Sequence, residues 1–259
     1  RRLEALRVGV ERFGAGDLGL RVDASGRDEV AAVAASFNRA AERIEALLRS
    51  HQTLLANASH ELRSPLARLK MALAMIEAAP DERRAQLQRE IDTDIAELDA
   101  LVEEVLLASR LDAGALRLAR EAVELRALAL EEAARSGATI DDEAAPDCVV
   151  SGDERLLRRA LRNLLDNARR HGGGEVRLGW QRRPGGVALA VSDRGPGVPA
   201  AYRERIFEPF FRLPGHGERD GGVGLGLSLV RQIARAHGGS VRCEPREGGG
   251  SRFVLELPG

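Results

Sequence analysis

The sequence has 259 residues, of which 44% are hydrophobic, 31% charged and only 3% aromatic, and its formal net charge is −1. This composition is typical of helix-rich soluble domains with cores of Leu, Val and Ala, and the length suits one or two ordinary domains or several small ones. Arginines are spread among acids, which argues against nucleic-acid binding. No apolar run is long enough to predict a membrane-spanning helix. Two distant cysteines, Cys148 and Cys243, are expected to be buried and reduced, although a disulfide is formally possible.

Residues 1–49 are predicted to form a helix, a short linker and a second helix. Glycines concentrate between positions 14 and 26, as expected for a linker. Apolar residues then recur at spacings of three and four, which indicates an amphipathic helix that needs a partner. They are Val30, Val33, Phe37, Ala41, Ile44 and Leu48.

Residues 50–112 have the pattern of a helical hairpin. Apolar residues repeat as in the a/d seam of a bundle: Leu55, Leu62, Leu69 and Ile76, interleaved with Ala58, Leu66 and Leu73. Pro80 and Asp81 interrupt this pattern and predict a turn, after which helical spacing resumes as far as Val105. Two such helices bury too little surface to stand alone, so a homodimer that completes a four-helix bundle is predicted.

From about residue 116, strand-like and helical segments alternate and glycine becomes frequent. Strands are expected at 176–178, 187–191, 241–243 and 253–257, and helices at 154–170 and 223–236. This mixture predicts an α+β sandwich in which helices cover one face of a single sheet. The expected fold is therefore multidomain: a helical signal-relay segment (1–49), a dimerising helical hairpin (50–115) and an α+β ligand-binding domain (116–259).

The octet SHELRSPL, which starts at Ser59, carries the first candidate chemistry. His60 lies about 200° around the helix from a seam leucine and is expected on the outer face, with Ser64 one turn further on the same side. A neutral imidazole offers a nucleophilic nitrogen, and Glu61 could accept its other ring N–H. Pro65 is expected to bend the helix. Taken alone, the octet is better explained by a surface histidine in a charged helix.

A second cluster lies on the helix predicted at 154–170. Asn163 and Asn167 are four residues apart and share one face, while leucines and alanine bury the other. Neutral amide oxygens suit Mg²⁺ that is held mainly by phosphates and water. Arg170 and His171 extend the same face toward a phosphate and a base. Asparagine-rich surface faces are also common without any ligand.

A third cluster directly follows the strand predicted at 187–191. Asp193 at a strand end can accept a hydrogen bond from an adenine amino group, and Gly195 and Gly197 allow the backbone to close on a ring. An ordinary turn accounts for the same residue types.

A glycine-rich turn, with Gly222, Gly224 and Gly226, opens the helix predicted at 223–236. Such a turn can bind phosphate through backbone N–H groups and the helix dipole. It follows no first strand and has no acid about twenty residues on, so a dinucleotide-binding fold is excluded. The segment before it holds three of the six phenylalanines, including Phe207, and is interpreted as a lid with aromatic anchors.

In order and spacing these five segments resemble the H, N, G1, F and G2 boxes of sensor histidine kinases, across residues 51–257. Upstream, residues 14–18 and 28–38 are similar to the connector and second helix of a HAMP signal-relay domain. The proline usual near the first HAMP helix is missing from residues 1–10. The resemblance therefore implies a parent anchored in the bacterial inner membrane by an upstream segment, with this portion cytoplasmic.

The resemblance also implies ATP and Mg²⁺ as ligands, phosphorylation of His60, and transfer to an aspartate of a response-regulator receiver domain. Glu61 would act as a base, and Ser64 stands where relatives with phosphatase activity carry a polar residue. Asn167 would bind Mg²⁺, and Arg170 and Arg212 would contact the γ-phosphate. The nucleotide-binding set implied is Asn163, Asn167, Arg170, His171, Asp193, Gly195, Gly197, Phe207, Arg212, Gly222, Gly224 and Gly226.

Two alternatives belong to other classes. An ATPase of the same nucleotide-binding superfamily, working as a mechanical clamp, would turn over ATP without forming phosphohistidine, and it leaves His60 and Glu61 unexplained. A non-enzymatic dimeric relay with a degenerate nucleotide domain would need a broken box, and the sequence shows none.

Overall fold

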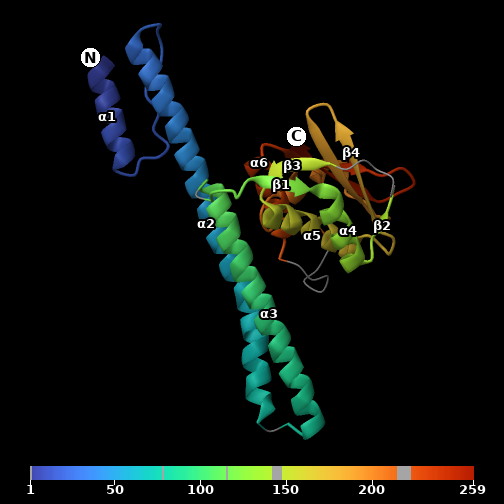
Figure 1. Cartoon of the computed structure of the whole chain (residues 1–259). Helices are drawn as coiled ribbons and strands as arrows, with labels where there is room; N and C mark the ends of the chain where they lie inside the picture. The colour runs from blue at the N-terminus through green and yellow to red at the C-terminus, as the bar shows by residue number, and fades with distance from the viewer. Residues whose placement is uncertain (1, 78, 115, 142–147, 215–222) are drawn as a thin grey trace. The chain divides into compact units, whose positions relative to one another are not determined.

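A computed structural model describes residues 2–77, 79–114, 116–141, 148–214 and 223–259. Three helices come first: α1 (Arg2–Gly14), α2 (Glu29–Ile76) and α3 (Asp81–Asp112) (Figure 1). Strands and shorter helices follow, which confirms the predicted order of an all-helical region and then an α+β domain. Within the described ranges, no helix combines the length and the apolar character needed to cross a membrane. The chain divides into two compact units, at Asn57.

The unit that ends at Asn57 contains α1, a connector and the first part of α2, as predicted. Asn38 clamps the connector, because its Oδ1 accepts from the Val22 amide at 2.9 Å and its Nδ2 donates to the Val22 carbonyl at 2.8 Å. Phe13 and Phe37 pack edge to face with their ring centroids 5.5 Å apart. The predicted apolar stripe is only partly buried, since Val33 is 56% exposed. A single chain therefore leaves part of this face without a partner.

The second unit begins with the hairpin formed by the rest of α2 and by α3. α2 continues through Pro65, and the predicted turn lies between Ile76 and Asp81. The predicted seam divides into two faces. One packs within the hairpin, where Ala72, Leu87 and Ile91 form a small core. The other is exposed in the single chain and includes Leu66, Leu73, Ile95 and Val102. Such an exposed apolar face is what the sequence predicts for a hairpin that forms a four-helix bundle with a second copy.

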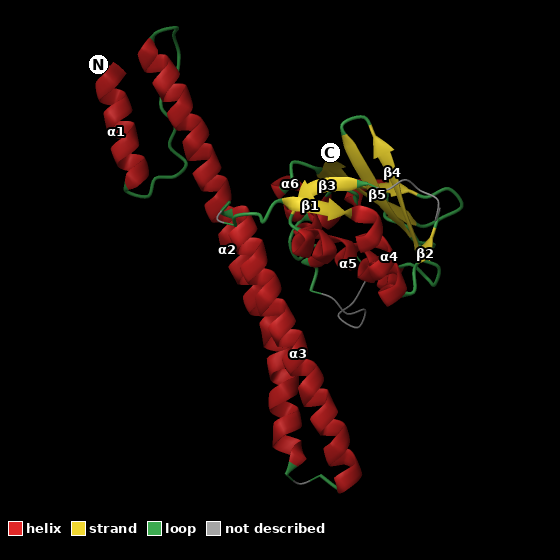
Figure 2. Cartoon of the chain, viewed as in Figure 1, coloured by secondary structure: helices red, strands yellow, loops and turns green. Residues whose placement is uncertain are grey.

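The α+β domain is built on one five-stranded sheet with the strand order β2-β4-β5-β7-β6 (Figure 2). Its strands are β2 (Thr139–Ile140), β4 (Arg177–Arg183), β5 (Gly186–Ser192), β6 (Ser240–Pro245) and β7 (Ser251–Pro258). All pairs are antiparallel except β2 with β4. β1 (Glu121–Glu124) and β3 (Val149–Gly152) form a separate two-stranded sheet.

Three helices, α4 (Leu125–Ser136), α5 (Glu154–His171) and α6 (Gly226–Ala236), share one apolar core with the large sheet. Their residues pack with alternate residues of β5 and β7, such as Leu189 and Leu255. The opposite face buries only a small group that includes Ala188 and Ala190. The predicted sandwich with helices on one face is therefore confirmed. Short single-turn helices, η1 (Ala200–Tyr202) and η2 (Arg205–Phe207), lie between β5 and α6.

Several local predictions need correction. The helix expected from residue 223 begins at Gly226, because Gly224 has a φ of +80°, which a helix does not allow. The sequence patterns also missed α4 and the three short strands β1, β2 and β3. Cys148 and Cys243 are both buried and outside any disulfide, as expected, and burial raises the pKa of Cys243 to about 11.

Candidate functional site

Helix α5 carries the predicted asparagine pair on a firmly held element. Its N-cap is Asp153, whose side chain accepts a hydrogen bond from the Leu156 amide at 3.3 Å. Its apolar face is buried in the core through Leu161, Leu164, Leu165 and Ala168. Asn163 and Asn167 lie on the opposite side and are half-buried. The sequence pattern therefore placed both amides correctly on the face turned away from the core.

The two asparagines do different things. Asn163 joins two helices, because its Nδ2 donates to the carbonyl of Gly226 at 3.1 Å. Asn167 has no hydrogen bond within the described residues and lines a cleft. Those residues hold no cluster of three or more His, Cys, Asp and Glu side chains suited to a metal. A single amide oxygen fits Mg²⁺ that arrives with a polyphosphate and is held mainly by phosphate and water.

Asp193 lies directly after β5 and is only 4% exposed. Its Oδ1 accepts from the amides of Gly195 at 2.9 Å and Ser251 at 3.1 Å. Its own amide donates to the Ser251 carbonyl at 2.9 Å. These bonds fix the carboxylate and leave Oδ2 without a hydrogen bond in the described part of the chain. A buried acid with one available oxygen on a cleft wall can accept a hydrogen bond from an amino group.

The glycines around Asp193 allow three chain segments to pass close together. A Cβ at Gly195 would lie 2.2 Å from the His171 carbonyl oxygen, and one at Gly250 would lie 2.0 Å from the Asp193 carbonyl oxygen. Gly197 has a φ of +77°, and its Cβ would meet the Gly250 carbonyl at 3.0 Å. These glycines therefore allow backbone segments of the chain itself to pass close to one another. The prediction that Gly195 and Gly197 let the backbone approach a bound ring stays a prediction.

The segment with three phenylalanines is fixed at two points. Phe207 is 1% exposed and belongs to the main core, so it anchors the segment instead of lining the cleft. Phe210 donates its amide to the Gly224 carbonyl at 2.9 Å and adopts a φ of +61°. Gly224 must be a glycine here, because its Cβ would lie 3.0 Å from the Phe210 backbone. Gly222, predicted to bind nucleotide, lies outside the described residues.

On α2, His60 and Ser64 are both exposed, as their predicted position on the outer face requires. Neither ring nitrogen of His60 has a hydrogen-bond partner among the described residues, so the predicted hydrogen bond to Glu61 is not formed here. Ser64 Oγ accepts a long hydrogen bond from Arg68 at 3.4 Å. The Arg68 guanidinium also pairs with Asp94 of α3 at 2.7 Å and so connects the two helices beside His60.

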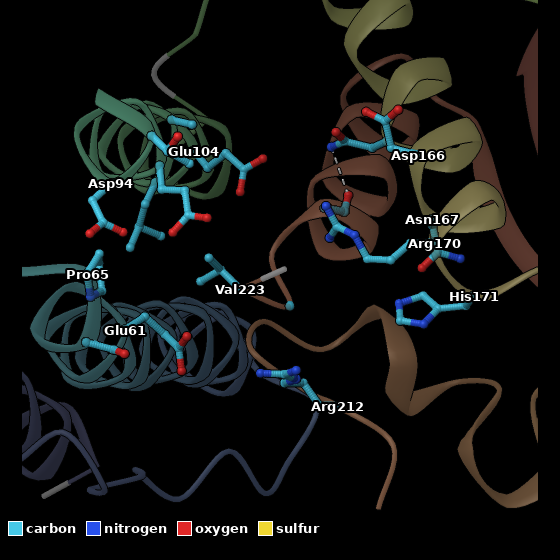
Figure 3. A pocket seen from close by; sticks show the side chains of 18 of the residues that line it. Glu61, Pro65, Asp94, Glu104, Asp166, Asn167, Arg170, His171, Arg212 and Val223 are labelled. Atoms are coloured by element: carbon cyan, nitrogen blue, oxygen red, sulfur yellow. Dashed lines mark hydrogen bonds between the residues drawn. The ribbon is translucent and has the colours of Figure 1, made fainter. Parts of the chain in front are cut away.

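One cleft of about 1200 Å³ is lined by most of the predicted residues. In Figure 3, Asn167, Arg170 and His171 lie on one side of it, and Glu61 and Glu104 lie on the other. Of the predicted set, those that line it are His60, Glu61, Ser64, Asn163, Asn167, Arg170, His171, Asp193, Gly197, Arg212, Gly224 and Gly226. Gly195 and Phe207 do not line it. The cleft therefore brings together an accessible imidazole and a set of polar groups on α5 and β5.

Side chains of both charges line this cleft, among them Arg170 and Glu104. Arg159 of α5 lies 3.8 Å from both Glu103 and Glu104 of α3. Burial raises the pKa of Glu104, and the nearby charges of Arg159 and Arg170 oppose that rise. A bound anion in the cleft would therefore compete with Glu104 for Arg170.

Sequence patterns missed two groups that hold Asp193. Ser251 uses its amide and carbonyl to bind Asp193, and its Oγ accepts from the Val198 amide at 3.1 Å. Arg246 donates to the Asp193 carbonyl at 3.0 Å. Antiparallel pairing of β5 with β7, in which Ser192 faces Arg252, brings Ser251 to this position. The signal available in the sequence was the glycine run at 248–250 immediately before a predicted strand.

Comparison with known proteins gives the same division of the chain in the same order. Residues 1–46 match the HAMP domain, and residues 50–114 match the His Kinase A (phospho-acceptor) domain. Residues 152–259 match the family described as Histidine kinase-, DNA gyrase B-, and HSP90-like ATPase. These matches define a nucleotide-binding domain joined to a histidine-bearing helical hairpin.

Individual relatives agree. Sensor protein RstB of Escherichia coli (strain K12) is 36% identical over 98% of this chain and 59% of RstB. Sensor histidine kinase CpxA of the same strain is 33% identical over 90% of this chain and 52% of CpxA. The chain belongs to the sensor histidine kinase family of two-component systems, and it spans little more than half the length of these relatives.

Solved structures show the same architecture. Full-length ShkA in complex with AMPPNP is 30% identical, with a TM-score of 0.57 over 80% of this chain and 45% of ShkA. Histidine kinase ThkA in complex with response regulator protein TrrA has a TM-score of 0.65 over 86% of this chain and 66% of ThkA. ThkA is 24% identical to this chain, so that likeness concerns the fold alone.

Proposed function

We propose that this chain transfers the γ-phosphoryl group of ATP to its own His60 and then to an aspartate of a response regulator. The observation that carries the proposal is the shared cleft, which is lined both by exposed His60 and by Asn167 and Asp193. The His Kinase A match over residues 50–114 supports the choice of His60. We also propose the division into a relay segment (1–49), a phosphotransfer hairpin (50–115) and a catalytic domain (116–259).

The side chains of the cleft suit the parts of ATP. The free Oδ2 of Asp193 would accept a hydrogen bond from the adenine amino group. Arg170 and Arg212 would contact the terminal phosphates, and Asn167 would be the protein ligand of Mg²⁺. When bound, Mg²⁺ neutralises negative charge on the triphosphate. The structure of full-length ShkA in complex with AMPPNP, a similar protein, supports ATP as the ligand.

The proposed step is an in-line displacement at the γ-phosphorus. A ring nitrogen of His60 forms the new N–P bond, and the bond from phosphorus to the β,γ-bridging oxygen breaks. ADP leaves with that electron pair, and the proton on the other ring nitrogen passes to Glu61. The segment pinned by Phe207 and by the Phe210–Gly224 hydrogen bond would exclude water.

Two partners follow from the proposal. A second copy of the chain would cover the exposed apolar residues of the hairpin, such as Leu66, Leu73, Ile95 and Val102, and complete a four-helix bundle. A receiver domain would then take the phosphoryl group, as the complex of ThkA with TrrA suggests by analogy. Ser64, one helical turn from His60, would orient a water that hydrolyses the phosphoryl group from the aspartate of that partner. Membrane attachment through an upstream segment stays a prediction.

The test is incubation of the chain with γ-labelled ATP and Mg²⁺. Wild type and a His51→Gln control, on the same helix, should acquire an acid-labile label, and His60→Gln should acquire none. Label retained by His60→Gln would overturn the proposal. ATP turnover without label in wild type would favour the clamp ATPase, and neither turnover nor label would favour the non-enzymatic relay.

A further inference from the structure

His237 is the most enclosed of the histidines that the structure describes, at 2% exposed. It directly follows α6 and precedes Gly238 and Gly239. Its Nε2 accepts a hydrogen bond from the Asp153 amide at 3.0 Å, and its Nδ1 lies 2.8 Å from the Ile233 carbonyl oxygen. Because a carbonyl only accepts, Nδ1 carries the proton and Nε2 is the acceptor. These two partners therefore fix one neutral tautomer.

The chain makes room for this ring. A Cβ at Gly152 would lie 2.9 Å from His237 Cδ2 and also 2.9 Å from Leu157 Cδ1. A larger residue at position 152 would force the imidazole or the end of the Leu157 side chain to shift. The neighbourhood of His237 is thus shaped around the ring, and the ring is not simply filling a gap.

His237 lies at one end of an antiparallel helix pair, and the candidate nucleotide site lies at the other. The Asp153 amide is at the start of α5 and His237 directly follows α6. At the opposite end, Asn163 donates to the carbonyl of Gly226, the first residue of α6. Ten residues of α5 separate the two hydrogen bonds, which corresponds to about 15 Å of helix.

Between these two ends the contact is apolar. Leu157, Ala160 and Leu161 of α5 share the main core with Val230 and Ile233 of α6. Apolar packing is not directional, so it sets the distance between helices more firmly than their position along one another. The hydrogen bonds at the ends are directional and can set that position.

We propose that His237 is a positioning residue for nucleotide binding. By accepting from the Asp153 amide it fixes how far α5 extends along α6. It thereby holds Asn163 beside Gly226 and Asn167 in the lining of the cleft. The inference rests on the proposal that the cleft binds ATP.

The substitutions Gln and Asn separate the two hydrogen bonds of His237. In His237→Gln the side-chain oxygen reaches the position of Nε2 and can still accept from Asp153. In His237→Asn the side chain reaches only the position of Nδ1, so the Asp153 amide is left buried without a partner. Both variants keep a neutral polar side chain.

The experiment measures Mg²⁺-ATP affinity of the full chain by calorimetry at 25 °C, with thermal unfolding of each variant recorded alongside. His237→Gln should bind ATP within about twofold of wild type, and His237→Asn on the order of tenfold more weakly. The control is Glu132→Gln, which removes a buried carboxylate on the other side of α5. It should lower stability and leave ATP affinity unchanged.

Two outcomes would overturn the positioning role alone: wild-type affinity in His237→Asn, or an equal loss in a Glu132→Gln chain of similar stability. A wild-type chain without ATP affinity would overturn the proposed function and the inference together. The affinity of the wild-type chain therefore distinguishes the two failures.

Discussion

Glu132 of α4 is a buried carboxylate, 1% exposed, that connects α4 to α5. It accepts hydrogen bonds from Arg162 at 2.8 and 2.9 Å, from Arg135 at 2.7 Å and from Arg158 at 3.1 Å. Burial alone would raise the pKa of this carboxyl. The hydrogen bonds from the three arginines outweigh burial and lower its pKa to about 2.

The free energy at stake follows from that shift. Lowering the pKa from 4.5 to about 2 favours the folded state by about 3 kcal/mol. Because the folded-state pKa is the lower one, this contribution is complete above about pH 5 and is lost as the pH falls toward 2. Glu132→Gln should lower the free energy of unfolding by about 3 kcal/mol and not more, because no arginine is left buried without a partner. Arg158 keeps its ion pairs with Glu131 and Glu154 at 2.6 Å, and Arg135 and Arg162 are partly exposed to solvent.

The assay is urea unfolding followed by the fluorescence of Trp180, the only tryptophan, which lies in the core of the α+β domain. Glu132→Gln should lower the free energy of unfolding by about 3 kcal/mol at pH 7 and by clearly less at pH 3.5. The control Glu131→Gln removes an exposed partner of Arg158 and should cost less than about 1 kcal/mol. Equal losses in both variants, or a loss at Glu132 that does not change with pH, would refute the reasoning.

Two further predictions concern the cleft. Gly250→Ala should destabilise the domain by at least about 3 kcal/mol and abolish ATP binding, because the new Cβ would collide with the Asp193 carbonyl. The control is Gly249→Ala, which has a similar φ of +99° but open space around its Cβ, and it should cost about 1–2 kcal/mol. Urea unfolding measures the stability of each variant, and calorimetry measures its ATP affinity. Equal effects of the two substitutions would contradict the inference that Gly250 is needed where its backbone passes Asp193. Asn167→Ala should abolish labelling by γ-labelled ATP and leave the oligomeric state by light scattering unchanged; full labelling would mean that Asn167 binds no metal.

Long periodic segments and strongly apolar strands could be predicted because their local pattern alone decides their state. α5 is such a case, with an N-cap acid, an apolar face and basic residues in its last turn. β2 is the opposite case: it is two residues long and exists only because it pairs with Arg177 and Leu178. α4 was missed since a glutamate occupies a core position on it, and the arginines that make Glu132 acceptable there are mostly on α5.

The site was predictable to a similar extent. The places of Asn163 and Asn167 on a helix face and of Asp193 at a strand end could be predicted, and their roles toward ATP and Mg²⁺ stay predictions. The groups that hold Asp193 in position could not, because Gly250 and Ser251 lie more than fifty residues later and reach it through the register of β5 and β7. Sequence patterns suggest which residues are chemically able, and strand order determines which of them meet.

The two histidines at the centre of these proposals show why burial and hydrogen bonding have to be known. His60 is exposed and its ring nitrogens have no hydrogen-bond partner in the described residues, so either nitrogen can present a lone pair to phosphorus in the appropriate tautomer. His237 is buried and both its ring nitrogens are engaged in hydrogen bonds, so it cannot attack a phosphorus atom and can only hold the start of α5 in position. His60 lies in the octet SHELRSPL inside a long helix, whereas His237 precedes two glycines at a helix end. The same imidazole is available for chemistry in one place and fixed for positioning in the other, and its surroundings alone make the difference.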